Sequence, residues 1–198
     1  MRPFPVLSSA LAALLFAAVA ASPTIAQEAA VPEGPQVGDL APDFTITAVT
    51  RHGVLRDPVR LSDYRGETVV IAFFPRARTS GCTVQMEAYR DRYNEVFRGG
   101  RGVTLLAISV DPDTALLSWA QDANFPMLFG SDIGGEVGTK YGAFRGQIDD
   151  RSLFVVDPEG RISYTARPFR QMAENAYTEL AEAVARVTPA AADEVERR

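Results

Sequence analysis

The sequence predicts a single α/β domain in which a mixed central sheet is flanked by helices. Two continuous runs of β-branched and apolar residues, TVVIAFF (68–74) and GVTLLAISVD (102–111), are typical of strands buried on both faces. Each run is followed by a segment that indicates a helix, as in strand–helix units. With 198 residues, of which 46% are hydrophobic, the chain is long enough to bury one sizeable core.

The elements around the first buried run follow from their patterns. Residues 43–49 and 59–64 flank a turn near His52 and predict short strands in a hairpin-like entry. Residues 83–97 predict a helix that ends at a pair of glycines. One face of this helix is apolar, and we interpret it as core rather than as a cofactor platform: Met86, Tyr89, Tyr93, Val96 and Phe97.

The second half of the chain alternates in the same way. Asp111-Pro112 opens a helix, because proline is tolerated in a first helical turn. The remaining elements are the rest of that helix to about residue 124, an extended piece at 125–132, a weak glycine-rich helix at 133–142, strands at 151–157 and 161–167, and an amphipathic helix at 170–187. Strand, helix, strand and helix followed by a hairpin and a closing helix describe a thioredoxin-like fold.

The two ends of the chain differ from this domain in composition. Arg2 precedes an apolar run and then small residues, which predicts an export signal with cleavage after either Ala20 or Ala26. An uncleaved membrane anchor is the alternative, although the apolar run is shorter than the roughly 20 residues that span a bilayer. The predicted organisation is an export signal (1–26), a flexible spacer (27–36), a domain (37–187) and a frayed tail (188–198). We therefore expect an exported protein, in the bacterial periplasm or secreted.

The charge of the chain narrows the classes of partner. Its formal net charge is −5, and it has no block of Lys or Arg. Such a chain is a poor candidate for binding nucleic acid or an anionic membrane surface. Chemistry on small molecules is favoured instead.

Cys82 is the only cysteine in the sequence, although export leads to compartments in which cysteines normally pair. It lies at the first turn of the predicted helix 83–97, where unpaired N–H groups and the positive end of the helix dipole face its sulfur. This position favours the thiolate, which is the reactive form of the side chain. Cys82 is therefore either a reactive nucleophile or a small buried apolar residue.

The residues around Cys82 resemble a known family. The run PRARTSGC (75–82) matches the Pro-x-x-x-Thr-x-x-Cys signature of peroxiredoxins, and FFPRARTSGCTVQ (73–85) is most similar to the bacterioferritin-comigratory, or peroxiredoxin Q, branch. The likeness extends from residue 37 to about residue 169 and includes LLAISVD, FPMLFGSD and RSLFVVDPEGRI. This resemblance implies a thioredoxin fold and a thiol-dependent peroxidase.

The resemblance also implies a set of catalytic residues. Cys82 would be the peroxidatic nucleophile that attacks hydrogen peroxide or an organic hydroperoxide and becomes a sulfenic acid. Thr79 would hold the peroxide through its hydroxyl, and Pro75 would shield the site from water. Arg151, at the start of RSLFVVD, would steady thiolate and peroxide with its fixed charge and fork of donors. Three other arginines remain alternatives for that role: Arg76, Arg78 and Arg145.

The chain departs from the branch pattern at one position. Many peroxiredoxin Q proteins carry a second cysteine five residues after the first, where this chain has Glu87. No internal disulfide is possible with one cysteine, so an external thiol or a thioredoxin-like partner must reduce the sulfenic acid. By analogy we expect a monomer or weak homodimer. The alternative function is a redox sensor or binding protein that oxidises once without turnover.

Other thiol chemistries fit the sequence poorly. A cysteine hydrolase needs a base beside the nucleophile, and the single histidine, His52, lies in a turn before the central strand. A thioredoxin-type oxidoreductase needs Cys-x-x-Cys, whereas the run here is CTVQ. One cysteine and one distant histidine also do not make a metal site, so we expect no metal and no cofactor.

Overall fold

The computed structural model describes residues 33–189. The predicted export signal (1–26), the first part of the spacer and the tail after residue 189 lie outside the described residues. Within 33–189, no helix has both the length and the apolar character needed to cross a membrane.

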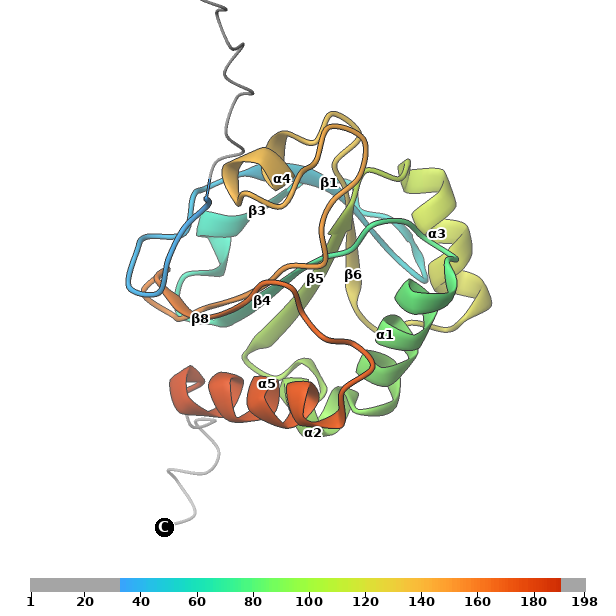
Figure 1. Ribbon diagram of the computed structural model, residues 1–198. Helices are drawn as coiled ribbons and strands as arrows, with labels where there is room; N and C mark the ends of the chain where they lie inside the picture. The colour runs from blue at the N-terminus through green and yellow to red at the C-terminus, as the bar shows by residue number, and fades with distance from the viewer. Residues whose placement is uncertain (1–32, 190–198) are drawn as a thin grey trace, which may run out of the picture. The chain divides into compact units, whose positions relative to one another are not determined.

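The centre of the described part is a mixed sheet, which confirms the predicted fold class (Figure 1). Eight strands form it: seven lie in the order β2-β1-β6-β5-β4-β7-β8, and the eighth, β3, pairs with β1. The strands are β1 (Thr45–Thr50), β2 (Gly53–Val54), β3 (Val59–Arg60), β4 (Thr68–Phe73), β5 (Val103–Ser109), β6 (Leu128–Ser131), β7 (Leu153–Val156) and β8 (Ile162–Ala166).

The directions of the central strands bring four chain segments to one edge of the sheet. Strands β4, β5 and β6 are parallel, whereas β7 runs antiparallel to β4. The carboxyl ends of the three parallel strands therefore lie beside the amino end of β7. This edge carries the loop 74–79 that leads into the helix with Cys82, the segments that follow β5 and β6, and the residues just before β7.

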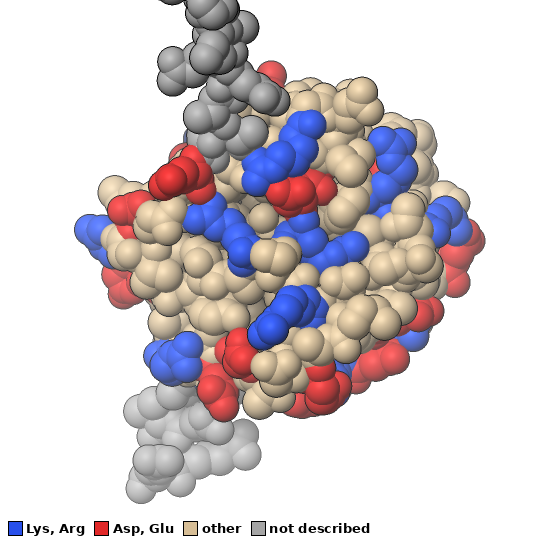
Figure 2. Space-filling model, viewed as in Figure 1, with Lys and Arg blue, Asp and Glu red and all other residues tan. Residues whose placement is uncertain are grey.

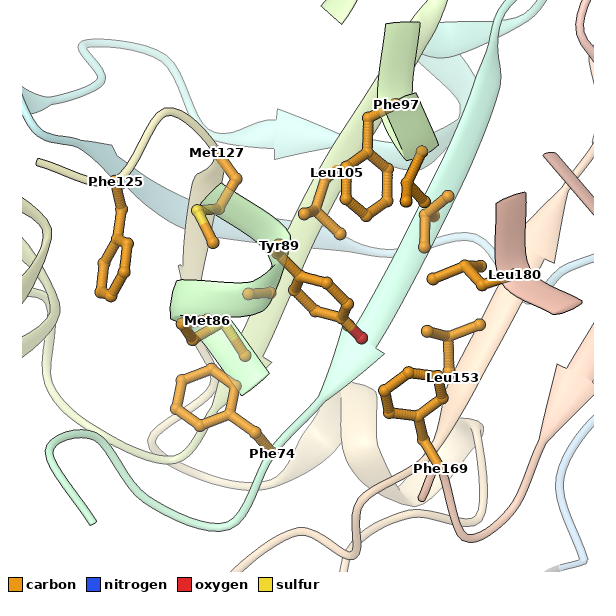
Figure 3. Close-up of a cluster of buried hydrophobic side chains, with 14 of the residues drawn as sticks. Phe74, Met86, Tyr89, Phe97, Leu105, Phe125, Met127, Leu153, Phe169 and Leu180 are labelled. Carbon is orange, nitrogen blue, oxygen red and sulfur yellow. The ribbon is translucent and has the colours of Figure 1, made fainter. Parts of the chain in front are cut away.

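Helices cover both faces of the sheet. The helices are α1 (Ser80–Asp91), α2 (Tyr93–Phe97), α3 (Asp113–Asp122), α4 (Glu136–Lys140) and α5 (Glu174–Val187), with short 3-10 turns η1 (Leu61–Tyr64) and η2 (Arg98–Gly100). One core lies between the sheet and α1, α2, α3 and α5, with Tyr89 of α1 among Leu105, Leu153 and Phe169 (Figure 3). A second core lies on the other face, beneath α4 and η1. The apolar face predicted for 83–97 is thus core.

Several element boundaries differ from the sequence prediction. The predicted helix 83–97 is two helices, because the backbone at Arg92 has φ −105° and ψ 18° and interrupts the helical path. Helix α1 also begins earlier, at Ser80, since the amide of Thr83 already donates to the Thr79 carbonyl at 2.8 Å. Apolar periodicity locates the buried face of a helix, but polar first turns such as this one carry no such signal.

Two further segments are shorter than predicted. Only the first two residues of 59–64 pair with β1, and the rest form the turn η1. The last helix begins at Glu174 rather than at residue 170, because the amide of Ala173 donates to the Arg170 carbonyl and closes a separate turn. Both differences leave the order of elements as predicted.

Candidate active site

Cys82 lies in the first turn of α1, at the edge of the sheet where β4 ends. Pro75 lacks an N–H group and cannot continue the hydrogen-bond ladder of β4. The chain therefore leaves the sheet there and forms a loop that leads into α1. The thiol is fully buried, at 0% exposure, and belongs to the core that includes Phe74 and Met86. Because the sulfur is buried, the residues packed around it control which molecules reach it.

Arg151 is the charged residue that contacts the sulfur. Its Nη2 donates to Sγ of Cys82 at 3.4 Å. The backbone around Arg151 is fixed, because the Phe73 amide donates to the Ser152 carbonyl at 2.8 Å and the Phe169 amide donates to the Arg151 carbonyl at 2.7 Å. The pairing of β7 with β4 therefore brings an arginine that lies 69 residues away in sequence to the cysteine.

Gln85 connects this arginine to the core, and the sequence analysis did not single it out. Its Oε1 accepts a hydrogen bond from Nη1 of Arg151, and its Nε2 donates to the hydroxyl of Tyr89 at 2.8 Å. Gln85 is fully buried, and burial raises the pKa of Tyr89 far above its ordinary value, so that hydroxyl stays neutral. Its position three residues after Cys82 is the signal that could have identified it, because residues three or four apart lie on the same face of a helix.

Asp111 anchors the loop between β4 and α1. It is a second residue of the site that the sequence analysis missed. Its Oδ2 accepts hydrogen bonds from the amide of Ala77 at 2.7 Å and from the hydroxyl of Ser109 at 2.9 Å. Within the loop, the hydroxyl of Thr79 donates to the carbonyl of Arg76 at 3.0 Å. Thr79 precedes the first residue of α1 but makes no side-chain capping bond to the helix. Its hydroxyl oxygen retains lone pairs for a bound molecule.

The structure places the alternative arginines elsewhere. Arg78 pairs with Asp122 at 2.5 Å, and Arg145 pairs with Asp150 at 2.6 Å. Arg76 is exposed, and its carbonyl accepts the hydrogen bond from Thr79. His52 lies in the exposed turn between β1 and β2, where its Nε2 accepts from Nε of Arg51 at 3.2 Å. Among these candidates, Arg151 has the contact with Cys82.

The lack of a side chain at Gly81 leaves space for the side chains of Gln171 and Arg151. A Cβ at this position would lie 3.2 Å from Nε2 of Gln171 and 3.4 Å from Nη2 of Arg151. The former distance is tighter than ordinary van der Waals contact. A larger residue at position 81 would therefore press on Gln171 and crowd the arginine that faces the sulfur.

Basic side chains spread over the middle of the face shown in Figure 2, although the protein is acidic overall. A cleft in the described part of the protein is lined by Arg145, Asp150, Arg151 and Arg167. Cys82 does not line that cleft, but Arg151, whose Nη2 contacts Sγ of Cys82, does. The cleft therefore reaches the guanidinium beside the thiol.

The described residues bring no metal-binding group together. No set of three or more His, Cys, Asp and Glu side chains within 33–189 is arranged to hold a metal ion. The site therefore offers a buried thiol, a guanidinium and neutral hydrogen-bonding groups. This set suits a two-electron reaction at sulfur.

Comparison with known proteins adds the family context. Residues 37–165 match the model of the AhpC/TSA family. Peroxiredoxin Bcp of Escherichia coli K12 is 32% identical over 145 residues, which cover 68% of this chain and 87% of that protein. Thioredoxin peroxidase of Echinococcus granulosus is 36% identical over 138 residues, covering 63% and 67% of the two chains. The crystal structure of peroxidoxin BcpB from Mycobacterium tuberculosis superposes with a TM-score of 0.66 at 24% identity, covering 78% of this chain and 99% of that one.

Proposed function

The chain belongs to the AhpC/TSA family and is a thiol-dependent peroxidase of the peroxiredoxin kind, and we propose that Cys82, Arg151, Thr79 and Pro75 carry its reaction. The observation that supports this proposal best is the 3.4 Å contact between Nη2 of Arg151 and the buried sulfur of Cys82. A permanent positive charge beside a thiol can pair with the thiolate and with negative charge that develops on the peroxide.

The first step oxidises the sulfur by two electrons. The Cys82 thiolate attacks one peroxide oxygen and the O–O bond breaks. Cys82 becomes a sulfenic acid, and the other oxygen takes a proton and leaves as water or an alcohol. Arg151 stays charged throughout, because a guanidinium does not give up its proton in proteins.

Thr79 and Pro75 are assigned positioning and shielding roles. The Thr79 hydroxyl already donates to the Arg76 carbonyl, which directs its lone pairs away from the loop and supports a role as acceptor for the proton of the bound peroxide. Pro75 is half-buried where β4 ends. Its ring presents no N–H to water, which suits a wall of the site.

The recycling step uses a thiol from outside the chain, since the sequence has one cysteine. A thiol attacks the sulfenic sulfur, water leaves and a mixed disulfide forms. A second thiol then attacks this disulfide, restores the Cys82 thiol and releases the reductant as a disulfide. A thioredoxin-like protein suits this step, and the E. granulosus relative is named a thioredoxin peroxidase.

Location and assembly complete the proposal. The basic and apolar pattern of residues 1–26 supports export, and fractionation of cells that express the full chain tests it. Recovery in the cytoplasmic fraction contradicts export.

A monomer or weak homodimer is proposed, and sedimentation at several concentrations gives its mass. A stable higher oligomer contradicts that part.

The experiment that tests the peroxidase is peroxide consumption with dithiothreitol as reductant. The wild-type protein should turn over many equivalents, and Cys82→Ser should turn over none. Arg151→Ala should lower the rate at least about tenfold, because it removes a charged donor at the reacting sulfur. The matched control is Arg78→Ala, since Arg78 is an arginine of the same loop whose guanidinium pairs with Asp122 instead.

Each outcome has a defined meaning. Consumption of one equivalent or less by the wild type contradicts a turnover enzyme and leaves a sensor that oxidises once. Equal losses in Arg151→Ala and Arg78→Ala contradict the specific role of Arg151, because a general effect of removing positive charge explains both.

A further inference from the structure

Asp149 is a buried carboxyl that the reaction does not use. Its side chain has 0% exposure, and neither oxygen has a hydrogen-bond partner among the described residues. The other buried acids differ from it in this respect. Asp132 accepts from the amides of Val137 and Gly138 at 3.2 and 2.8 Å, and Asp111 accepts from the active-site loop. A charged carboxylate without partners is costly to bury, so an isolated one demands an explanation.

Asp149 lies at the same edge of the sheet as Cys82. It is two residues before Arg151, and its backbone pairs with Phe144 in an isolated bridge. Its Oδ1 packs against α4 so closely that a Cβ at Gly138 would lie 2.2 Å from it. The absence of a side chain at Gly138 is thus what makes room for this carboxyl.

The charged groups that face Asp149 are acids. Burial, and then the charges of Asp132, Asp150 and Asp111, raise the pKa of Asp149 to about 7. These acids come from three directions, since Asp132 follows β6, Asp111 follows β5 and Asp150 is the adjacent residue. Within 33–189, no three or more of these acids are arranged to hold a metal ion.

The nearby basic groups are engaged elsewhere. Arg145, in the turn before Asp149, pairs with Asp150, and Nζ of Lys140 on α4 donates to the carbonyl of Asp43. Arg151 faces Cys82 and Gln85. The remaining charged residue of α4 is Glu136, which is exposed and negative. A proton is therefore the counter-charge that these surroundings favour on Asp149.

We propose that Asp149 is a proton-controlled positioning residue: its neutral carboxyl packs against Gly138 and holds the segment that presents Arg151 to Cys82, and loss of the proton displaces that segment and slows peroxide reduction. The inference rests on the role proposed above for Arg151. A neutral carboxyl costs less free energy to bury without a partner than a charged one, which draws towards water. Asp150 alone separates Asp149 from Arg151 in the chain. Its amide donates to the Ala143 carbonyl at 2.7 Å and would move with Asp149, so a shift of Asp149 reaches Arg151 directly.

The test is the pH dependence of the second-order rate constant for oxidation of Cys82 by hydrogen peroxide, followed by stopped flow. If only the protonated form is competent, the wild-type rate should fall about tenfold from its plateau by about pH 8, one pH unit above the midpoint. Asp149→Asn keeps the size and neutrality of the protonated carboxyl and should abolish this alkaline fall. The matched control is Asp150→Asn, an adjacent exposed acid: the fall should persist but move to lower pH, because the charge of Asp150 helps to raise the pKa of Asp149.

A second measurement does not depend on any variant. The carboxyl carbon of Asp149 in the wild-type protein, followed by NMR, should titrate with a midpoint near 7, and the side-chain nitrogen signals of Arg151 should shift with the same midpoint. A midpoint in the ordinary range of aspartate overturns the proposal, as does an Arg151 signal that ignores the titration.

Failure here is distinguishable from failure of the proposed function. If Cys82→Ser and Arg151→Ala lose activity at about pH 6 while wild type and Asp149→Asn share one alkaline profile, the inference alone is wrong. If Arg151→Ala is fully active at about pH 6, the role of Arg151 is wrong and the inference falls with it. Peroxide consumption that is slow in the wild type and unchanged in Cys82→Ser contradicts the peroxidase itself.

Discussion

Asp149→Asn should make the protein more stable at alkaline pH relative to the wild type. The folded pKa of Asp149, about 7, lies above the ordinary aspartate value of 3.8. The folded state therefore binds the extra proton between these values, and the stability that this provides is fully present below 3.8 and lost as the pH rises through about 7. From about pH 5 to pH 8 the wild type passes through roughly two pH units of this loss, or about 3 kcal/mol of unfolding free energy. Asparagine does not titrate.

The measurement is urea-induced unfolding of both proteins at several pH values from about 5 to 8. The difference in unfolding free energy, variant minus wild type, should rise by about 3 kcal/mol over this range, because other titrating groups cancel in the difference. A difference that stays constant with pH would refute the reasoning. Asp150→Asn serves as the control: Asp149 still titrates in it, although without the charge of Asp150 its folded pKa is lower, so the difference should change by less than for Asp149→Asn.

Three further variants test the packing and the site. Gln85→Leu should destabilise the fold by about 1–3 kcal/mol, because it leaves the buried partners of Gln85 unsatisfied. It should also slow the oxidation of Cys82 by peroxide, because it frees Arg151. Unfolding and stopped-flow assays measure the two effects, and an unchanged rate contradicts the positioning role. Leu180→Ala should cost about 2–5 kcal/mol, since Leu180 is fully buried between α5 and the sheet; a loss below 1 kcal/mol, roughly, disproves tight packing there. Asp122→Ala breaks an exposed pair with Arg78 and should change stability by no more than about 1 kcal/mol; a larger loss on unfolding in urea argues against this surface pair being weak.

The order of elements was predictable because it depends on local pattern. The runs 68–74 and 102–111 are apolar without alternation, and only strands covered on both faces need such a composition. They became β4 and β5, paired in parallel at the centre of the sheet. The boundaries were less predictable, because polar turns such as that at Ser80 leave no trace in the apolar periodicity.

The site divides in the same way between local and distant residues. Cys82, Thr79 and Pro75 lie within eight positions of each other, so one short motif identified them. Arg151 was named through resemblance, and three other arginines stayed open until the fold separated them. Gln85 was missed because a buried glutamine has no distinctive pattern in sequence, although its spacing from Cys82 places it on the same helical face.

The sequence by itself determined the alternation of strands and helices and the single thiol, because these follow from local pattern and composition. Only the tertiary structure decided which arginine meets the sulfur, since the antiparallel pairing of β7 with β4 brings Arg151 to Cys82. It also decided that Asp149 is buried beside other acids. Burial and the distances between charges are properties of packed elements that are distant in the chain, and no local window of sequence contains them.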